Sequence, residues 1–98
     1  MRLGDALSKF LVQLEADGRS LHTIRQYKRH LNSLAHWVAH EGLDGHVSAI
    51  DHEALARFLA SPAARTRPDG APKQACSVNA LRGSLKGFFS YLHLAGIL

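Results

Sequence analysis

Apolar residues recur at intervals of three and four along most of the chain, which is the spacing of an α-helix with one buried side. Segments with this pattern cover four ranges, and each is followed by a glycine or by a serine–proline pair that ends it: residues 3–16, 21–41, 51–60 and 77–94. No segment alternates apolar and polar residues over the length of a β-strand. The pattern therefore predicts an all-α fold of four helices.

The expected helix starts carry residues that favour capping. Ser20, Asp51 and Ser77 stand at the beginnings of the second, third and fourth helices. The side-chain oxygen of such a residue accepts a hydrogen bond from a backbone N–H that has no partner within the first turn. Ile50, next to Asp51, is placed to pack back onto the first turn of its helix.

The connection before the last helix, residues 61–76, differs in composition from the rest of the chain. It contains all three prolines, a Pro-Asp-Gly turn signal and three cations, but no large apolar residue. A connection of this length without structure of its own is uncommon in a compact domain, and it is usually either functional or mobile. We expect a long, solvent-exposed loop that carries Arg65, Arg67 and Lys73.

Composition limits the classes of function. A chain of 98 residues is enough for one domain. Twelve Lys and Arg against eight Asp and Glu give a net charge of +4 and a pI near 9.7, which favours a polyanionic partner, nucleic acid before an acidic membrane surface. The chain has no run of about 18 apolar residues and no leader-like start, so we expect a cytoplasmic protein without a membrane partner.

Polar residues gather on the two longest helices, opposite their apolar sides. On the second helix they are His22, Arg25, Arg29, His36 and His40, and on the fourth they are Asn79, Arg82, Lys86, Ser90 and His93. Gly83 and Gly87 lie beside the second set, and each costs a helix about 1 kcal/mol relative to alanine. This cost suggests that something, such as a phosphate backbone, approaches closely there; a solvated helix surface is the ordinary alternative.

Two stretches of the chain, together with the third helix, resemble a known family. They are Ser20-Leu21-His22-Thr23-Ile24-Arg25-Gln26-Tyr27 followed by Leu31, Leu34 and Trp37, and Ser77-Val78-Asn79 followed by Leu85-Lys86-Gly87-Phe88-Phe89-Ser90-Tyr91-Leu92 and Gly96. They resemble the second and last helices of the N-terminal core-binding domain of tyrosine recombinases, the phage integrase family. Ile50-Asp51 and Phe58-Leu59 match its third helix, so the resemblance covers nearly the whole chain in the right order.

The resemblance implies a four-helix SAM-like orthogonal bundle over residues 1–98 that grips double-stranded DNA at the core site during integration or recombination. The implied partners are DNA, a C-terminal catalytic domain of the same parent chain and other recombinase protomers. Ala80 and Lys86 stand where many members have arginine. A lysine keeps the charge but lacks the planar two-pronged donor, so phosphate contact is expected there rather than base contact.

The resemblance implies no catalysis by this chain, because the catalytic Arg, Lys, His and Tyr residues of the family belong to the other domain. Tyr27 falls on an apolar stripe and Tyr91 at a structural position of the last helix, so both are expected to pack rather than react. No cofactor or metal is expected: His36 and His40 have a zinc-like spacing but no third ligand, and Cys76 is a single thiol. Trp37 is expected in the core.

The candidate DNA-contacting residues come from the polar sides of the second and fourth helices, their first turns and the connecting loop. They are Ser20, His22, Thr23, Arg25, Gln26, Arg29, Lys73, Ser77, Asn79, Arg82 and Lys86. The competing function is a basic helical module for protein–protein interaction. A free-standing helix-turn-helix regulator is disfavoured, because the connection before the last helix is too long for that motif.

Overall fold

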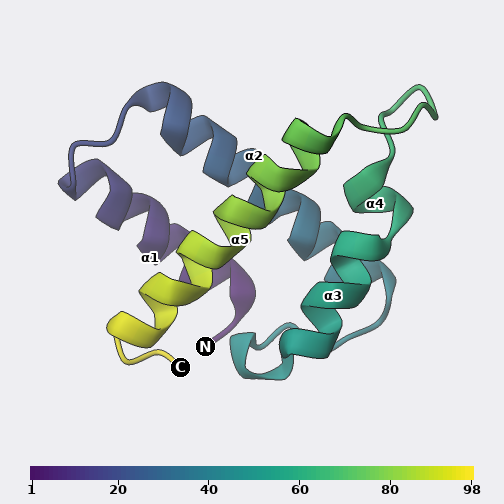
Figure 1. Ribbon diagram of the computed structural model, residues 1–98. Helices are drawn as coiled ribbons and strands as arrows, with labels where there is room; N and C mark the ends of the chain where they lie inside the picture. The colour runs from purple at the N-terminus through teal and green to yellow at the C-terminus, as the bar shows by residue number, and fades with distance from the viewer.

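The computed structural model describes residues 1–98 as an all-α fold (Figure 1). Its elements are α1 (Leu3–Ala16), α2 (Leu21–His40), the short 3-10 turn η1 (Val47–Ala49), α3 (His52–Ala60), α4 (Pro62–Arg65) and α5 (Ala75–Leu94). The predicted all-α class is confirmed. The structure has one helix more than the four that the hydrophobic pattern predicted, and this additional helix is α4.

The two longest helices, α2 and α5, cross each other, and α5 passes in front of α2 in Figure 1. Helix α1 packs against both of them on one side of the crossing. Helices α3 and α4 lie on the other side, where α4 contacts both α2 and α5. The crossing of α2 and α5 is therefore the centre of the fold, and most of the core lies around it.

The core is built from the apolar stripes that the pattern identified, with two aromatic clusters. Phe10 of α1 contacts the rings of Tyr27, Phe88 and Tyr91 at centroid distances of 5.1, 5.4 and 5.2 Å. Trp37 packs against Phe58 at 5.5 Å and is only 6% exposed, which confirms its predicted place in the core. These contacts join α1 to both α2 and α5, and α3 to α2.

Two of the three expected helix caps are present. The Ser20 hydroxyl accepts a hydrogen bond from the Thr23 N–H at 3.1 Å, and the Asp51 carboxylate accepts one from the Ala54 N–H at 2.8 Å. Ile50 is buried beside Asp51, as expected. The prediction for Ser77 is wrong: α5 begins two residues earlier, at Ala75, and its N-cap residue, Gln74, makes no side-chain capping bond.

Residues 61–76 are not one long irregular loop, and the prediction is wrong in its extent: Pro62–Arg65 form α4 and α5 begins at Ala75, so that residues 66–74 alone connect the two helices. Pro62 opens α4, where a missing N–H costs nothing, and Ala64 is fully buried. A tight turn follows, closed by a bridge between Thr66 and Pro72. The Lys73 N–H then donates to the Arg65 carbonyl at 2.7 Å, which brings the chain into helical geometry before Ser77.

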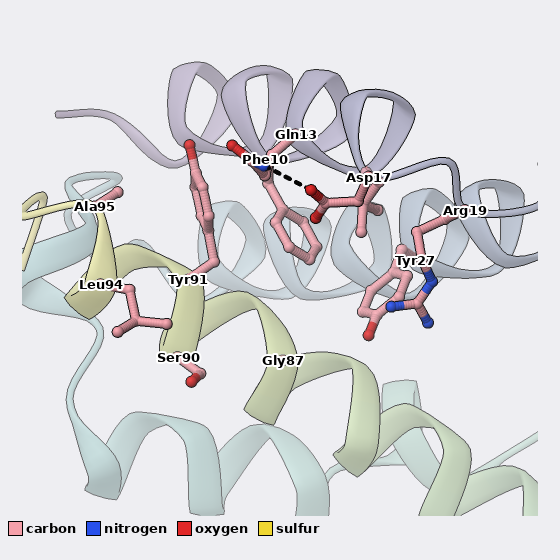
Figure 2. Close-up of a pocket in the computed structure, with 11 residues that line it drawn as sticks. Phe10, Gln13, Asp17, Arg19, Tyr27, Gly87, Ser90, Tyr91, Leu94 and Ala95 are labelled. Atoms are coloured by element: carbon pink, nitrogen blue, oxygen red, sulfur yellow. Dashed lines mark hydrogen bonds between the residues drawn. The ribbon is translucent and has the colours of Figure 1, made fainter.

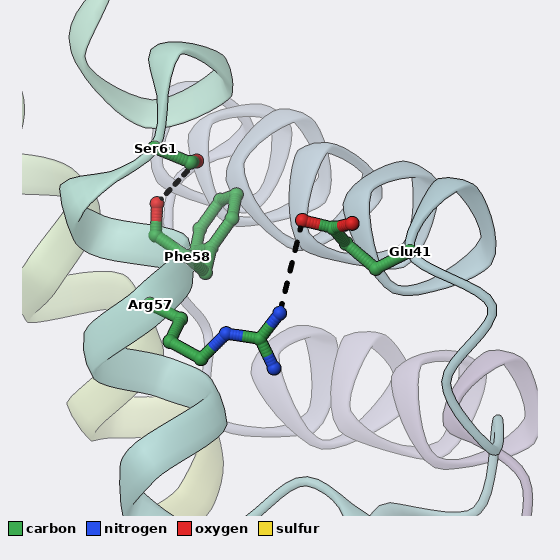
Figure 3. Close-up of polar contacts among 4 residues, drawn as sticks. All are labelled: Glu41, Arg57, Phe58 and Ser61. Carbon is green, nitrogen blue, oxygen red and sulfur yellow. Dashed lines mark hydrogen bonds and ion pairs between the residues drawn. The ribbon is translucent and has the colours of Figure 1, made fainter.

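Contacts around the end of α3 hold α4 in place. The Ser61 hydroxyl donates to the Phe58 carbonyl (Figure 3), and the Arg65 guanidinium donates to the Leu59 carbonyl at 2.8 Å. Arg57 lies 5.6 Å from the Trp37 ring centre and 4.0 Å from the Glu41 carboxylate. Arg65 and Arg57 therefore serve the packing of α3 and α4.

The two glycines of α5 have different surroundings. A Cβ atom on Gly87 would lie 2.8 Å from the Tyr27 hydroxyl oxygen, whereas one on Gly83 would meet nothing within 4 Å. The group that approaches Gly87 closely is thus a side chain of α2. The suggestion that a phosphate backbone explains this glycine is wrong.

Candidate nucleic-acid interface

Helices α2 and α5 each contain 20 residues and no Asp or Glu. Helix α2 carries Arg25, Lys28 and Arg29, and α5 carries Arg82 and Lys86, all with exposed side chains. All eight carboxylates lie on α1, on α3 or in the connections between helices. The crossing of these helices therefore gathers positive charge that no carboxylate of either helix offsets.

The ion pairs of the structure leave those cations unpaired. One joins Arg57 to Glu41 (Figure 3), and the other joins Arg67 to Asp69 at 3.1 Å. Both pairs are largely exposed, so water and salt weaken them. The five cations of α2 and α5, together with Lys73, remain without a carboxylate partner.

A polar cavity of about 330 Å³ lies between α2, α5 and the chain that leads into α5. We call it the basic hollow; it is lined by Gln26, Arg29, His30, Ser33, Arg67, Lys73, Ser77, Ala80 and Leu81. Three of these side chains are cations and none is acidic. The hollow therefore offers positive charge and several hydrogen-bond donors to an anion.

The position of Lys73 in this hollow depends on the structure of residues 61–76. Helix α4 is anchored by buried Ala64, and the Thr66–Pro72 bridge turns the chain back. The backbone bond from Lys73 to Arg65 then fixes the point at which the lysine side chain leaves the chain. Lys73 was a candidate from the sequence, but Arg67, which lines the same hollow, was not.

A second, shallow depression runs along α2 beside the basic hollow. Its lining is entirely polar: Arg25, Lys28, Arg29, Asn32, Ser33 and His36. Arg29 and Ser33 line both cavities. The cationic surface is therefore continuous from Arg25 on α2 to Lys73 before α5, and Lys28 is a member that sequence reasoning did not single out.

The remaining candidates lie elsewhere. Arg82 and Lys86 line a separate groove of about 290 Å³ between α3 and α5, with an apolar floor that includes Leu55 and Phe89. The Asn79 side-chain oxygen accepts a hydrogen bond from Arg82 at 2.8 Å. At the first turn of α2, the Ser20 hydroxyl also donates to the Thr23 hydroxyl at 2.9 Å, and exposed His22 lies beside them.

His30 is a functional candidate that sequence reasoning missed. Its Nδ1 lies 2.7 Å from the Ser84 hydroxyl on α5, so the pair links the two crossing helices. Burial lowers the pKa of His30 below its ordinary value, and the positive charges of Arg29 and Lys73 lower it further. The available signal was weak: Ser84 stands next to Leu85 and three residues after Leu81 on the apolar side of α5.

Both tyrosines lie around an apolar cavity of about 490 Å³ between α1, α2 and α5 (Figure 2). Tyr27 and Tyr91 each pack against Phe10, which agrees with the expectation that they are packing residues. Arg19 is the single cation at this cavity. No group of three or more His, Cys, Asp or Glu side chains is arranged to hold a metal ion, and no helix combines the length and apolar character needed to cross a membrane.

Comparison with known proteins identifies the family. The model of the phage integrase N-terminal SAM-like domain matches residues 7–96, which is nearly the whole chain. Searches of curated proteins and of solved structures found no match. The family match includes α2, α5 and the basic hollow between them. The family resemblance is thereby confirmed, and the chain belongs to the family of phage integrase N-terminal SAM-like domains.

Proposed function

We propose that this chain is the DNA-binding domain of a tyrosine recombinase and that it grips duplex DNA at the core site during integration or recombination. In this proposal a separate C-terminal domain of the parent protein cuts and rejoins the strands, and other protomers assemble on the same DNA. The observation that carries the proposal is the continuous cationic surface from Arg25 to Lys73. Four of its cations, Arg25, Lys28, Arg29 and Lys73, have no carboxylate partner, and only Arg67 is paired, with Asp69.

The strength of the expected interaction follows from the number of unpaired cations. Arg25, Lys28, Arg29 and Lys73 provide four charges on the continuous surface. Each phosphate that a protein neutralises releases counterions from DNA, so four contacts give a slope of about −3.6 for log affinity against log salt. Affinity would then fall about 100-fold between roughly 50 and 200 mM salt.

The decisive test measures duplex binding against salt for the chain and for two matched variants. Lys73→Gln removes one charge from the basic hollow but keeps the backbone bond to Arg65. It should reduce the salt slope by about 1 and weaken binding to all sequences alike. Lys9→Gln is the control, because Lys9 is exposed on α1, away from the hollow, and it should leave the slope unchanged.

Three results would contradict the proposal. They are duplex binding that does not depend on salt, equal effects of Lys73→Gln and Lys9→Gln, and no duplex binding at low salt. The last result would favour the competing function, a basic helical module for protein–protein interaction. The groove with the apolar floor between α3 and α5 is the surface on which such a partner would then be sought.

A further inference from the structure

A histidine forms part of the wall of the basic hollow. His30 is half-buried in α2, and its Nδ1 lies 2.7 Å from the Ser84 hydroxyl of α5. Ser84 is the only polar residue of the buried interior. The pair is therefore both a link between the helices and a titratable group at an anion-binding surface.

The partner of His30 allows both protonation states of the ring. When Nδ1 carries no proton, the Ser84 hydroxyl can donate to it; when Nδ1 is protonated, the ring can donate to the hydroxyl oxygen. A hydroxyl group serves in either role after a simple rotation. The ring can therefore gain a proton without losing its contact with α5.

The charged groups around the hollow oppose this gain while the hollow is empty. Arg29 faces His30 from α2, and Lys73 and Arg67 line the hollow from the segment before α5. The nearby carboxylate, Asp69, is paired with Arg67, and α5 contributes only neutral groups to the hollow. Burial and these positive charges favour the neutral ring.

We propose that the basic hollow holds one phosphate group of the DNA backbone and that His30 takes up a proton when this phosphate binds. The negative charge of the phosphate offsets Arg29 and Lys73 and attracts the imidazolium. Coupling between two binding events is reciprocal, so protonation of His30 strengthens phosphate binding by the same factor. The inference rests on the proposed function, because DNA supplies the phosphate.

The size of the effect follows from the linkage. His30 has one pKa in the free protein and one in the DNA complex. For each unit by which binding raises this pKa, duplex affinity at a pH below both values is about tenfold higher than at a pH above both. Other histidines of α2, such as His36 and His40, are exposed and lie outside the lining of the hollow. Proton uptake at the hollow must therefore be measured for His30 by itself.

The test is a site-resolved titration of the histidine rings by NMR in the 98-residue chain. Spectra are recorded across about pH 5 to 8 for the free protein, with a saturating short DNA duplex and with inorganic phosphate. We expect the pKa of His30 to rise by about a unit or more with the duplex. Duplex affinity is measured over the same range for the chain, His30→Asn and His40→Asn.

The two variants separate the contribution of His30 to the pH dependence of duplex affinity from the contributions of other groups that titrate at low pH. His30→Asn places a side-chain oxygen near the position of Nδ1, so Ser84 keeps a partner while the titration is lost. It should remove the His30 part of the rise in affinity, about tenfold per pKa unit, whereas His40→Asn should keep it. The wild-type titration does not depend on how well either variant folds.

The outcomes distinguish this inference from the proposed function. Salt-dependent duplex binding with an unchanged pKa of His30 overturns the inference alone. Absence of duplex binding overturns both. A rise with inorganic phosphate in a protein that does not bind duplex overturns the assignment to DNA and leaves a site for the free anion.

Discussion

The contact between Gly87 and Tyr27 predicts opposite effects for two chemically identical substitutions on α5. Gly83→Ala adds a methyl group where nothing lies within 4 Å, whereas Gly87→Ala adds one 2.8 Å from the Tyr27 hydroxyl and 3.4 Å from a carbon of its ring. Both changes gain the helix propensity of alanine, about 1 kcal/mol. Only the second must displace a neighbour.

The displaced neighbour cannot move freely. The Tyr27 ring packs edge-on against Phe10, at a centroid distance of 5.1 Å and an interplanar angle of 85°. Forcing an extra methyl group into such packing costs about 1–3 kcal/mol. We therefore expect Gly83→Ala to stabilise the fold by about 1 kcal/mol and Gly87→Ala to destabilise it by about 1 kcal/mol.

A third substitution isolates the cause. Tyr27→Phe removes the hydroxyl oxygen at 2.8 Å and leaves ring carbons at 3.4 Å and beyond, so Gly87→Ala should become stabilising when the two changes are combined. Urea unfolding of the single and double variants gives the coupling energy, expected at about 2 kcal/mol. The melting temperature should change in the same direction, by about 4–8 °C for each kcal/mol of stability in a domain of this size. If Gly87→Ala stabilises as much as Gly83→Ala does, Tyr27 does not constrain the helix crossing.

Three further predictions concern stability. Asp51→Ala removes the cap of α3 and should cost about 1 kcal/mol in urea unfolding. Phe58→Ala, at a fully buried position against Trp37, should cost about 3–5 kcal/mol by the same measurement. Because burial lowers the pKa of His30 in the folded state, the unfolded chain binds that proton more readily. The contribution of His30 to the free energy of unfolding should therefore be fully present above about pH 6.5. It should decrease as the pH falls below that value, until the pH is lower than the pKa of His30 in the folded protein. Unfolding curves of His30→Asn, measured without DNA, should lack this part of the pH dependence.

The long helices could be predicted from the sequence because each shows a complete apolar stripe and a clear end. Helix α1 and most of α2 lie where the pattern placed them, and Ser20 caps α2 as expected. Helix α4 could not be predicted in this way, since four residues are too short to show a periodic stripe. Its only buried member is Ala64, whose side chain is a single methyl group.

The candidate site was predictable only in part, for a related reason. Helical spacing groups residues of one element, so it identified Arg25 and Arg29 as neighbours on α2. It cannot tell which residues of α5 and of the preceding segment will face them. The hollow joins Arg29 to Arg67 and Lys73 through a helix crossing and a tight turn, and the His30–Ser84 contact spans 54 positions of the chain.

The backbone of the segment before α5 bears on the proposed DNA binding, because it is more regular than its composition suggested. Its prolines and glycine suggested mobility, yet Pro62 opens a helix and Gly70, at φ +87°, completes a closed turn. Lys73 therefore leaves a backbone that is already ordered on both sides, by the bond to Arg65 and by α5. Ordering a flexible loop on binding consumes part of the interaction energy. In the proposed complex with DNA, Lys73 would leave a backbone already held by these bonds, so it should lose little more than side-chain freedom and contribute to affinity as a helix residue does.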